Sequence, residues 1–518
     1  MRFPALALAL FSASVLACSS STDEPPKGPA GPRLTKLPPL AAPPQLTTTR
    51  RFVATKAPQG PKAGPGNPAI FSILDEYKKL GFGAVTPGPG EAYVTRAIDG
   101  TTPPPPGPGA KRLLRFVHMP DLQILDDESP TRLASFDATD TINAAARPQD
   151  GYVCRMTNAA VRTVNALHRA EALSFVLLGG DNADSAQTNE VEWVLDILSG
   201  KEEVKCDSGK EDDPIPGPDN DGKDPFFAEG LTIPWKWVTG NHDVNVQGNL
   251  KLDDGNRASV LSTVAGGGTR DYTQDGFIER GDFVVADAKR ALLSRVELMT
   301  KVASHGDGHG LGDAEKASGR ATYTFDAPDS PIRFLVIDTA AETGGAEGII
   351  RQSEVDRVIK PALDKAQAEG KWVILASHHS VTSLTEDGGA FGTKQPDALT
   401  TDAWTKLVGG YPNVLFSMVG HSHEHRVRPI APAGGHAFWE VMTSAIMDYP
   451  HQFRLVEIFD QDNGWIMLRG TAVDPVTDDD PVAAEGHTRG LIDFLSGWSP
   501  DGLGKPDDRN VELWIKKP

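Results

Sequence analysis

Five short clusters of polar residues, each at the end of an apolar run, carry side chains of the kinds that bind metal ions. Carboxylates, imidazoles and amides are suitable ligands for divalent ions such as zinc, manganese and iron. Functional groups in layered α/β folds gather where strands end and loops begin, so the clusters are expected to meet. Each cluster alone would fit a turn or a buried polar pair, but the five in this order favour a metal centre. The clusters are Asp121 with Gln123, Asp181 with Asp184, Asn241 with His242 and Asp243, His378 with His379, and His421 with His423.

A pair of ions would give this centre hydrolytic chemistry. Two ions a few ångströms apart need a ligand that they share, and an aspartate carboxylate is the natural choice. A metal-bound hydroxide can attack phosphorus while the ions neutralise the charge that builds on the phosphoryl oxygens. An imidazole nearby can protonate the leaving oxygen. These residue types are therefore suited to a two-metal centre that could hydrolyse a bond to phosphorus.

The order and content of the clusters resemble the calcineurin-like metallophosphoesterase superfamily. Its pattern runs Asp-x-His, Gly-Asp-x-x-Asp, Gly-Asn-His-Asp/Glu, His and Gly-His-x-His, and the resemblance extends from about Arg112 to Phe459. The stretches DLQILDDESP and GGDNADSAQTNE also resemble a secreted bacterial subgroup of that superfamily. The resemblance implies a four-layer α/β sandwich, in which two mixed sheets pack face to face with helices outside. It also implies two divalent metal ions, which could be manganese, zinc or iron.

The resemblance further implies a role for each residue of the clusters. Asp181 would bridge the two ions, with Asp121 and His423 on the first ion. The second ion would be held by Asn241, His378 and His421. His242 would be the catalytic imidazole that binds no metal, and Asp243 would orient it. Asp184 and His379 would lie outside the ligand shell, where they hold geometry or contact substrate.

Gln123 departs from the family pattern, which most often has histidine at this position. An amide oxygen is a weaker and harder ligand than an imidazole. Gln123 could bind the first ion directly, bind it through water, or leave it loosely held. The identity and occupancy of the first ion depend on which of these applies.

The composition is that of a folded protein with an acidic surface. Charged residues make up 23% of the 518-residue chain, and the formal net charge is −19. A protein that binds duplex nucleic acid would need a basic stripe, so this balance argues against that class. A small phosphorylated substrate is still compatible, because metal ions can invert the local field.

The N-terminus predicts export. Residues 1–17 resemble a secretory signal peptide, since one arginine precedes an apolar stretch too short to span a bilayer. Val15-Leu16-Ala17-Cys18 resembles a bacterial lipoprotein box, which predicts a lipid anchor at Cys18 and a place in the cell envelope, periplasmic or on the outer surface. The alternative is a plain signal peptide and a secreted protein. The two other cysteines, Cys154 and Cys206, could pair in an exported chain or stay free thiols.

The rest of the chain divides into one large domain with flanking segments. Residues 18–67 read as a Pro/Gly-rich tether, 68–111 as an N-terminal extension with a short helix over 68–79, and 471–518 as a C-terminal extension. The domain, 112–470, carries inserts at about 199–230 and 244–324 and alternates strands with helices, which indicates an α/β fold. Strands are predicted at 112–118, 175–178, 235–239, 332–337, 372–376, 414–419, 438–442 and 455–459. Helices are predicted at 158–172, 190–198, 284–300 and 352–369.

The sequence thus predicts an exported, metal-dependent phosphoesterase that uses a metal-bridging hydroxide on a phosphomonoester or phosphodiester. One alternative is a pyrophosphatase or phosphodiesterase acting on nucleotides or lipid head groups. Another is a non-catalytic surface binding protein with a degenerate metal site, in which Gln123 marks lost catalysis. A variant at His242 that keeps its metals but loses turnover would separate the enzymes from the binding protein.

Overall fold

The computed structural model describes most of the chain. The described residues are 36–58, 74–136, 145–209, 215, 217, 220–267, 283–306, 308–497, 499 and 501–518. The predicted signal peptide, the lipoprotein box with Cys18 and much of the predicted tether lie outside these residues. Among the helices that the structure describes, none combines the length and the apolar character needed to cross a membrane.

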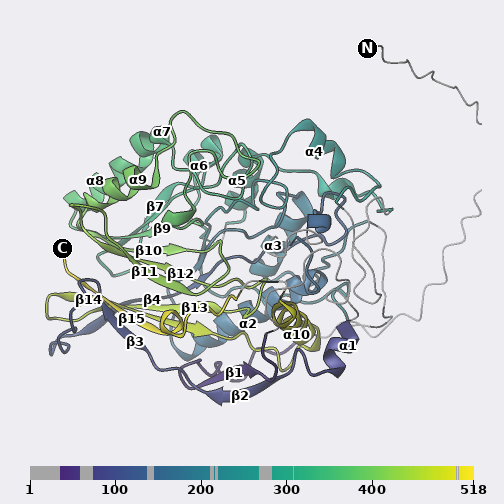
Figure 1. The fold of residues 1–518 in the computed structure, drawn as a ribbon, viewed down its shortest axis with the longest axis horizontal. Helices are drawn as coiled ribbons and strands as arrows, with labels where there is room; N and C mark the ends of the chain where they lie inside the picture. Colours follow the sequence, from purple (N-terminus) through teal and green to yellow (C-terminus); the bar gives the residue numbers. More distant parts are fainter. Residues whose placement is uncertain are drawn as a thin grey trace, which may run out of the picture.

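Two mixed β-sheets form the centre of the fold (Figure 1). The seven-stranded sheet has the order β3 (Val94–Ala97), β15 (Val511–Lys516), β14 (Trp465–Val473), β13 (Phe453–Asp460), β4 (Lys111–Met119), β5 (Val176–Leu178) and β6 (Trp235–Lys236). The six-stranded sheet has the order β11 (Arg426–Ile430), β12 (Phe438–Met442), β10 (Val414–Val419), β9 (Trp372–Ala376), β8 (Ile332–Val336) and β7 (Tyr323–Asp326). Strands β4, β5 and β6 run parallel, as do β8, β9, β10 and β12.

The two sheets pack face to face through aromatic rings. Phe116 of β4 contacts Phe334 of β8 edge to face, with ring centroids 5.4 Å apart. Phe175, just before β5, packs on the same Phe334 ring at 5.3 Å, and Phe325 of β7 stacks on it at 4.8 Å. Edge-to-face and offset contacts at these distances are the favourable geometries for aromatic pairs. This single core fixes the position of one sheet on the other.

Helices cover the outer faces. α2 (Val153–Ala170), α3 (Thr188–Ser199) and α10 (Pro481–Ser496) accompany the seven-stranded sheet, and α10 packs on α2. On the six-stranded sheet lie α7 (Gln352–Glu354), a π-helical turn (Val355–Ile359), α8 (Lys360–Ala368) and α9 (Thr401–Gly409), seen at the upper left of Figure 1. Short helices occur at α1 (Leu74–Lys79), α4 (Asp254–Ser259), α5 (Arg295–Ala303), α6 (Asp313–Ser318) and α11 (Pro506–Arg509). The predicted four-layer α/β sandwich is confirmed.

Several local predictions need correction. The helix predicted over 284–300 is instead a 3-10 turn (Ala288–Arg290) followed by α5, because Ser294 and Glu297 form a capping box that starts α5 at Arg295. The segment predicted as a Pro/Gly-rich tether contains β1 (Arg50–Ala54), which pairs with β2 (Val85–Pro89). Strand β15, beyond the predicted domain end, adds to the main sheet beside β14. The domain boundaries themselves stay predictions.

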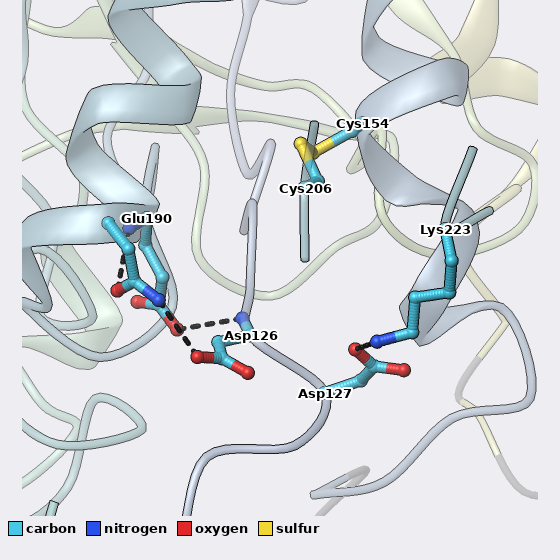
Figure 2. The surroundings of a disulfide bond; sticks show 7 residues. Asp126, Asp127, Cys154, Glu190, Cys206 and Lys223 are labelled. Atoms are coloured by element: carbon cyan, nitrogen blue, oxygen red, sulfur yellow. Dashed lines mark hydrogen bonds and ion pairs between the residues drawn. A yellow bond between two sulfur atoms is a disulfide. The ribbon is translucent and has the colours of Figure 1, made fainter. Parts of the chain in front are cut away.

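Cys154 and Cys206 form a disulfide, which settles the alternative that the sequence left open. The bond joins the first turn of α2 to the loop after α3, and Figure 2 shows it near the Asp127–Lys223 ion pair. Disulfides persist in oxidising compartments, so the bond agrees with the predicted export.

Candidate metal centre

The five predicted clusters come together at the carboxyl ends of parallel strands from both sheets. Asp121 and Gln123 follow β4, Asp181 follows β5, and Asn241 follows β6. From the other sheet, His378 follows β9, and His421 and His423 follow β10. The carboxyl ends of parallel strands lie at one edge of a sheet, which is why clusters far apart in sequence meet. A cavity of about 500 Å³ opens there, and its walls include Gln123, Asp181, Asp184, Asn241, His242, His421 and His423.

The backbone at these positions is unusual. Non-glycine residues with positive φ are uncommon, because the side chain then crowds the backbone. Five of the seven predicted metal ligands adopt such values: Asp121 (54°), Gln123 (42°), Asp181 (52°), His421 (77°) and His423 (55°). Strained backbone gathered at one place indicates a functional site, where the surrounding fold supports a costly geometry.

Two glycines let the ligand loops approach one another. A Cβ atom at Gly240 would lie 2.0 Å from Oδ1 of Asp181, and one at Gly420 would lie 2.6 Å from Oδ2 of Asp121. Neither position can carry a larger residue without moving a carboxylate. The glycines of the Gly-Asn-His-Asp and Gly-His-x-His motifs are therefore needed for close packing of the loops.

Asp121, Asp181 and His378 form a fully buried group whose ligand atoms lie within 4.8 Å of one another. Nε2 of His378 lies 2.8 Å from Oδ2 of Asp181 and 3.8 Å from Oδ1 of Asp121. Nδ1 of His378 lies 2.9 Å from the carbonyl oxygen of Gly179, which can only accept, so Nδ1 carries the proton. This contact directs Nε2 toward the carboxylates, which is the orientation of metal-bound histidines that are held by a carbonyl group.

His423 is held in the same manner by a carboxylate that the sequence analysis did not identify. Its Nδ1 lies 2.6 Å from Oδ2 of Asp448, and its Nε2 lies 3.3 Å from Oδ1 of Asp121. Asp448 lies in the loop after β12, which runs parallel to β10. The strand-end rule that located the other clusters could therefore have located this residue as well.

Two buried amide oxygens at the centre are suited to contact a cation. Oε1 of Gln123 and Oδ1 of Asn241 have no hydrogen-bond partner among the described residues, although both side chains are about 1% exposed. The amide nitrogen of Asn241 does have one, since it donates to the carbonyl of Gly248 at 3.1 Å. A buried acceptor without a partner is costly, and a cation at the centre would satisfy both oxygens. The residues present therefore fit a divalent metal.

The charge state of the imidazoles agrees with a cation-binding centre. Burial alone would lower the pKa of His378, but Asp181 and Asp121 raise it to about 9. The pKa of His423 rises to about 10 against the same effect of burial, because Asp121 and Asp448 lie beside it. By contrast, burial and the neighbouring imidazoles hold the pKa of His421 well below its usual value. The carboxylates thus create a strong negative potential, which attracts metal cations as it attracts protons.

His379 lies among these imidazoles but its nitrogens are engaged elsewhere. It belongs with His378 and His421 to a second group of possible ligands within 4.8 Å. Its Nε2 lies 2.9 Å from the carbonyl of Ala346 and its Nδ1 lies 2.8 Å from Oγ1 of Thr339. Both ring nitrogens of His379 are therefore committed to neighbouring groups, and its role outside the ligand shell stays a prediction.

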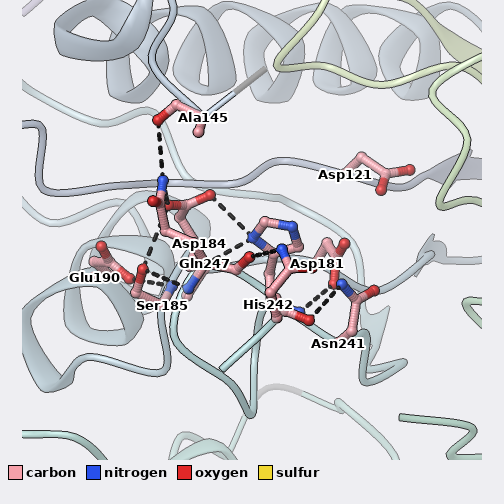
Figure 3. Close-up of polar contacts among 12 residues, drawn as sticks. Asp121, Ala145, Asp181, Asp184, Ser185, Glu190, Asn241, His242 and Gln247 are labelled. Carbon is pink, nitrogen blue, oxygen red and sulfur yellow. Dashed lines mark hydrogen bonds and ion pairs between the residues drawn. The ribbon is translucent and has the colours of Figure 1, made fainter. Parts of the chain in front are cut away.

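His242 is oriented by Asp184, not by Asp243 as expected. Nδ1 of His242 lies 3.0 Å from Oδ1 of Asp184 and 2.9 Å from its carbonyl oxygen (Figure 3). Asp243 turns the other way and accepts the backbone N–H groups of residues 182, 183 and 240 at 2.8–3.0 Å. No hydrogen bond or ion pair joins Asp243 to His242 in the part of the chain that the structure describes. Asp243 therefore fixes the loop that carries Asp181, and the sequence prediction that it orients His242 is wrong.

Asp184 is itself held as a charged group. Its Oδ2 lies 3.3 Å from Nη1 of Arg132 and 3.4 Å from Nε2 of Gln247, which also donates to the carbonyl of Ala145 (Figure 3). Burial would raise the pKa of Asp184, but His242 and Arg132 lower it to about 2. A charged Asp184 favours a proton on Nδ1 of His242 and leaves Nε2 for chemistry.

No family model matches the sequence, and no curated protein does. Among solved structures, similarity is found to a purple acid phosphatase from yellow lupin seeds, with 13% identity, a TM-score of 0.31, and coverage of 74% of this chain and 55% of that one. Sulfate thiohydrolase SoxB from Thermus thermophilus is 13% identical with a TM-score of 0.30, and the match covers 76% of this chain and 61% of SoxB. PhoD is 11% identical with a TM-score of 0.31, and the match covers 74% of this chain and 68% of PhoD. The matches with the first two span less than two thirds of those proteins. At such scores the similarities say nothing of the reaction, so the functional conclusion rests on the geometry of the site.

Proposed function

We propose that this protein is a metal-dependent phosphoesterase of the calcineurin-like type, with a centre for two divalent ions. The observation that carries the proposal is the buried Asp121–Asp181–His378 group, with the unpartnered oxygens of Gln123 and Asn241 around it. His421 and His423 would complete the ligand set, and Asp181 would lie between the ions. Manganese, zinc and iron all suit this mixture of carboxylate, imidazole and amide ligands. When bound, the ions supply Lewis-acid polarisation of the phosphoryl group and activation of water.

The chain's own residues provide the proton for the leaving group. His242 lines the cavity beside the proposed ligands, yet its Nδ1 is committed to Asp184. Asp184 stabilises the protonated form of the ring, and Nε2 is then the atom that can donate a proton to the leaving oxygen. The backbone N–H of His242 donates to Oδ1 of Asp181 at 2.8 Å, so the acid and the proposed bridging ligand keep a fixed separation. Breakage of the ester bond and protonation of the leaving group can therefore occur together.

The partners and location that the sequence predicts belong to the same proposal. A small phosphorylated molecule is the substrate class that the cavity of about 500 Å³ can admit. Export, with a lipid anchor at Cys18, would place the enzyme in the cell envelope. Replacement of Cys18 by serine should release a protein that otherwise sediments with membranes, and no change in sedimentation would contradict the anchor.

The enzymatic proposal is tested by hydrolysis assays on protein reconstituted separately with manganese, zinc and iron. Wild-type protein should hydrolyse a chromogenic phosphate ester only when metal is present. His242→Ala should keep its metal content and lose about 10²–10⁴-fold in kcat, which is the usual contribution of a general acid. His436→Ala, which changes a half-buried histidine outside the walls of this cavity, is the matched control and should behave as wild type. A folded, metal-loaded wild type without turnover would favour the non-catalytic binding protein instead.

A further inference from the structure

A second cavity, which we call the hairpin cavity, lies beside the β1–β2 pair and has a volume of about 260 Å³. Its walls come mainly from β1, β2, α10, the loop after β14 and residues 449–452. Strands β1 and β2 and helix α10 lie at the lower side of the molecule in Figure 1. The hairpin cavity shares no wall residue with the metal cavity, since Asp448 lines the metal cavity and Tyr449 lines the hairpin cavity. The two cavities are therefore separate sites.

Asp474 follows β14 and contributes a carboxylate to the hairpin cavity. Its Oδ1 accepts a hydrogen bond from Nε2 of Gln452 at 2.6 Å. Its Oδ2 has no hydrogen-bond or ion-pair partner among the described residues. Burial raises the pKa of Asp474 to about 6, although Gln452 and Arg50 lower it and Glu91 raises it further. A desolvated carboxylate with one oxygen unsatisfied costs folding free energy, and a ligand that donates to this oxygen offsets the cost.

Arg50 is the cationic group of the same cavity. Arg50 and Phe52 both line it, because alternate residues of a strand share a face. The guanidinium carbon of Arg50 lies 5.0 Å from the centre of the Phe52 ring, which is a cation–π distance. Within the part of the chain that the structure describes, the guanidinium forms no ion pair and no hydrogen bond. Asp478, the other carboxylate of the wall, is exposed to solvent. The hairpin cavity thus presents one unpaired guanidinium and one half-satisfied carboxylate.

Much of the remaining wall is apolar. Val476, Leu491 and Leu503 contribute aliphatic side chains. The rings of His451 and His487 stack with centroids 4.6 Å apart, and burial lowers the pKa of both, so they add no charge near neutral pH. Small-molecule sites combine an apolar wall of this kind with a few polar groups that fix the orientation of the ligand. Their usual volume is about 300–1,000 Å³, so the hairpin cavity suits a small ligand.

We propose that the hairpin cavity binds a small zwitterion with an apolar body, of the kind of a free amino acid with an aliphatic side chain. The ammonium group donates to Oδ2 of Asp474, and the ligand's carboxylate accepts from the guanidinium of Arg50. Both contacts are charge-assisted, which is the stronger class of hydrogen bond. The aliphatic body packs against Val476, Leu491 and Leu503.

Other ligand classes fit these walls less well. An amine alone leaves the guanidinium of Arg50 unpaired, and a carboxylic acid alone leaves the carboxylate of Asp474 unsatisfied. A metal ion needs several oxygen ligands, whereas the buried part of this wall offers one carboxylate. The inference does not depend on the proposed phosphoesterase function, because the site is separate from the metal cavity.

The test measures the binding of L-leucine, 3-methylbutylamine and 4-methylpentanoate to the full, metal-loaded protein by isothermal titration calorimetry. The amine lacks the carboxylate of leucine and the acid lacks its ammonium group, while the aliphatic body is the same. Leucine should bind at least about tenfold more tightly than either analogue, since each analogue loses one charge-assisted contact. Asp474→Asn and Arg50→Gln should each weaken the binding of leucine by at least about tenfold for the same reason.

A third variant removes space instead of charge. Ala484 lies on α10 in the wall of the hairpin cavity, so Ala484→Leu places a larger side chain there and should abolish the binding of leucine. The matched controls are Asp329→Asn and Arg357→Gln, which remove one charge each from exposed positions outside the cavity. Both controls should bind leucine as wild type does.

The results that overturn the proposal are distinct from those that bear on hydrolysis. Wild type that binds no leucine at concentrations up to about 10 mM refutes the site. Equal affinities for leucine and the amine refute the role of Arg50, and equal affinities for leucine and the acid refute the role of Asp474. Leucine binding that persists in Ala484→Leu and in both charge variants places the ligand elsewhere and also overturns the proposal. None of these results measures ester hydrolysis, so the proposed phosphoesterase function stands or falls separately.

Discussion

The contact between Asp448 and His423 allows a quantitative test of the metal centre. Oδ2 of Asp448 lies 2.6 Å from Nδ1 of His423, and Oδ1 lies 2.7 Å from Nε of Arg147. Burial would raise the pKa of Asp448, but Arg147 and His423 outweigh it and hold the pKa below the ordinary range. The carboxylate is therefore charged, and a charged acceptor on Nδ1 makes Nε2 a more basic ligand.

Asp448→Asn removes the charge and keeps an oxygen that can accept from His423. The loss of an outer-shell carboxylate of this kind typically reduces metal affinity by about 10–100-fold. At 1.36 kcal/mol per tenfold change, this corresponds to about 1.4–2.7 kcal/mol. The substitution also leaves Arg147, which is 6% exposed, without its nearest counter-charge. Such a buried charge costs about 3–5 kcal/mol of folding free energy, so stability and metal affinity must be measured separately.

Arg147→Gln is the matched control because it breaks the same ion pair and leaves the Asp448–His423 contact in place. Both variants should unfold at lower denaturant concentration than wild type when metal-free. Only Asp448→Asn should lose its metal to a competing chelator at a concentration about 10–100-fold lower than the concentration that wild type requires. Equal losses of metal affinity in the two variants, or no loss in Asp448→Asn, would refute the argument that this carboxylate tunes His423.

Three further predictions concern other parts of the chain. Gly240→Ala should lower the metal content and the activity, because the new Cβ would lie 2.0 Å from Oδ1 of Asp181 and displace that carboxylate. Unchanged metal content measured by elemental analysis would contradict the requirement for glycine at this position. Replacing Cys154 and Cys206 together by alanine should lower the free energy of unfolding by about 4 kcal/mol, because the disulfide closes a loop with a sequence separation of 52 and so restricts the unfolded chain. A change below about 1 kcal/mol in urea unfolding would contradict this entropic effect. Burial raises the pKa of Asp474 from 3.8 to about 6, so the folded state binds its proton more tightly than the unfolded state does. The contribution of the protonated Asp474 to the free energy of unfolding is therefore complete below pH 4 and is lost as the pH rises through 6. Asp474→Asn should therefore gain up to about 3 kcal/mol over wild type between pH 4 and pH 7.5, and a difference that does not change with pH would contradict the sign.

The strand-end rule predicted most of the candidate site. Asp121, Asp181 and His378 each follow an apolar run that is a buried parallel strand, and chemistry at such ends is a property of the layered fold. The sequence could not reveal which neighbour orients which ring. Asp243 adjoins His242 in sequence, yet Asp184, 58 residues earlier, contacts its Nδ1. Side-chain direction in a loop depends on backbone angles and on contacts with distant loops, and neither is encoded in spacing.

The fold was predicted at the level of layers, but several strands were missed, including β14 (Trp465–Val473) in the interior of the seven-stranded sheet. The strands that were located, such as β4, β9 and β10, have the continuous apolar runs that are typical of strands covered on both faces. Strand β15 (Val511–Lys516) and strand β1 (Arg50–Ala54) were missed because they lie beyond the recognised motifs, in segments interpreted as extension and tether. Their pairing depends on partners such as β14 and β2, which supply the missing hydrogen bonds only in three dimensions.

The left-handed backbone at the ligands explains why the centre depends on the whole sandwich. Asp121 and Asp181 both have positive φ angles. The N–H of Asp121 donates to the carbonyl oxygen of Gly180, and the N–H of Gln123 donates to the carbonyl oxygen of Asp181. Across the sheets, the N–H of His421 donates to the Asp121 carboxylate at 3.1 Å. Each strained loop is thus stabilised by a loop from another strand, and the two sheets contribute opposite halves of the ligand set. A metal ion at this position would be bound by ligands from both sheets, which the aromatic core already holds together. Metal binding should therefore stabilise the packing of one sheet on the other as well as the site itself.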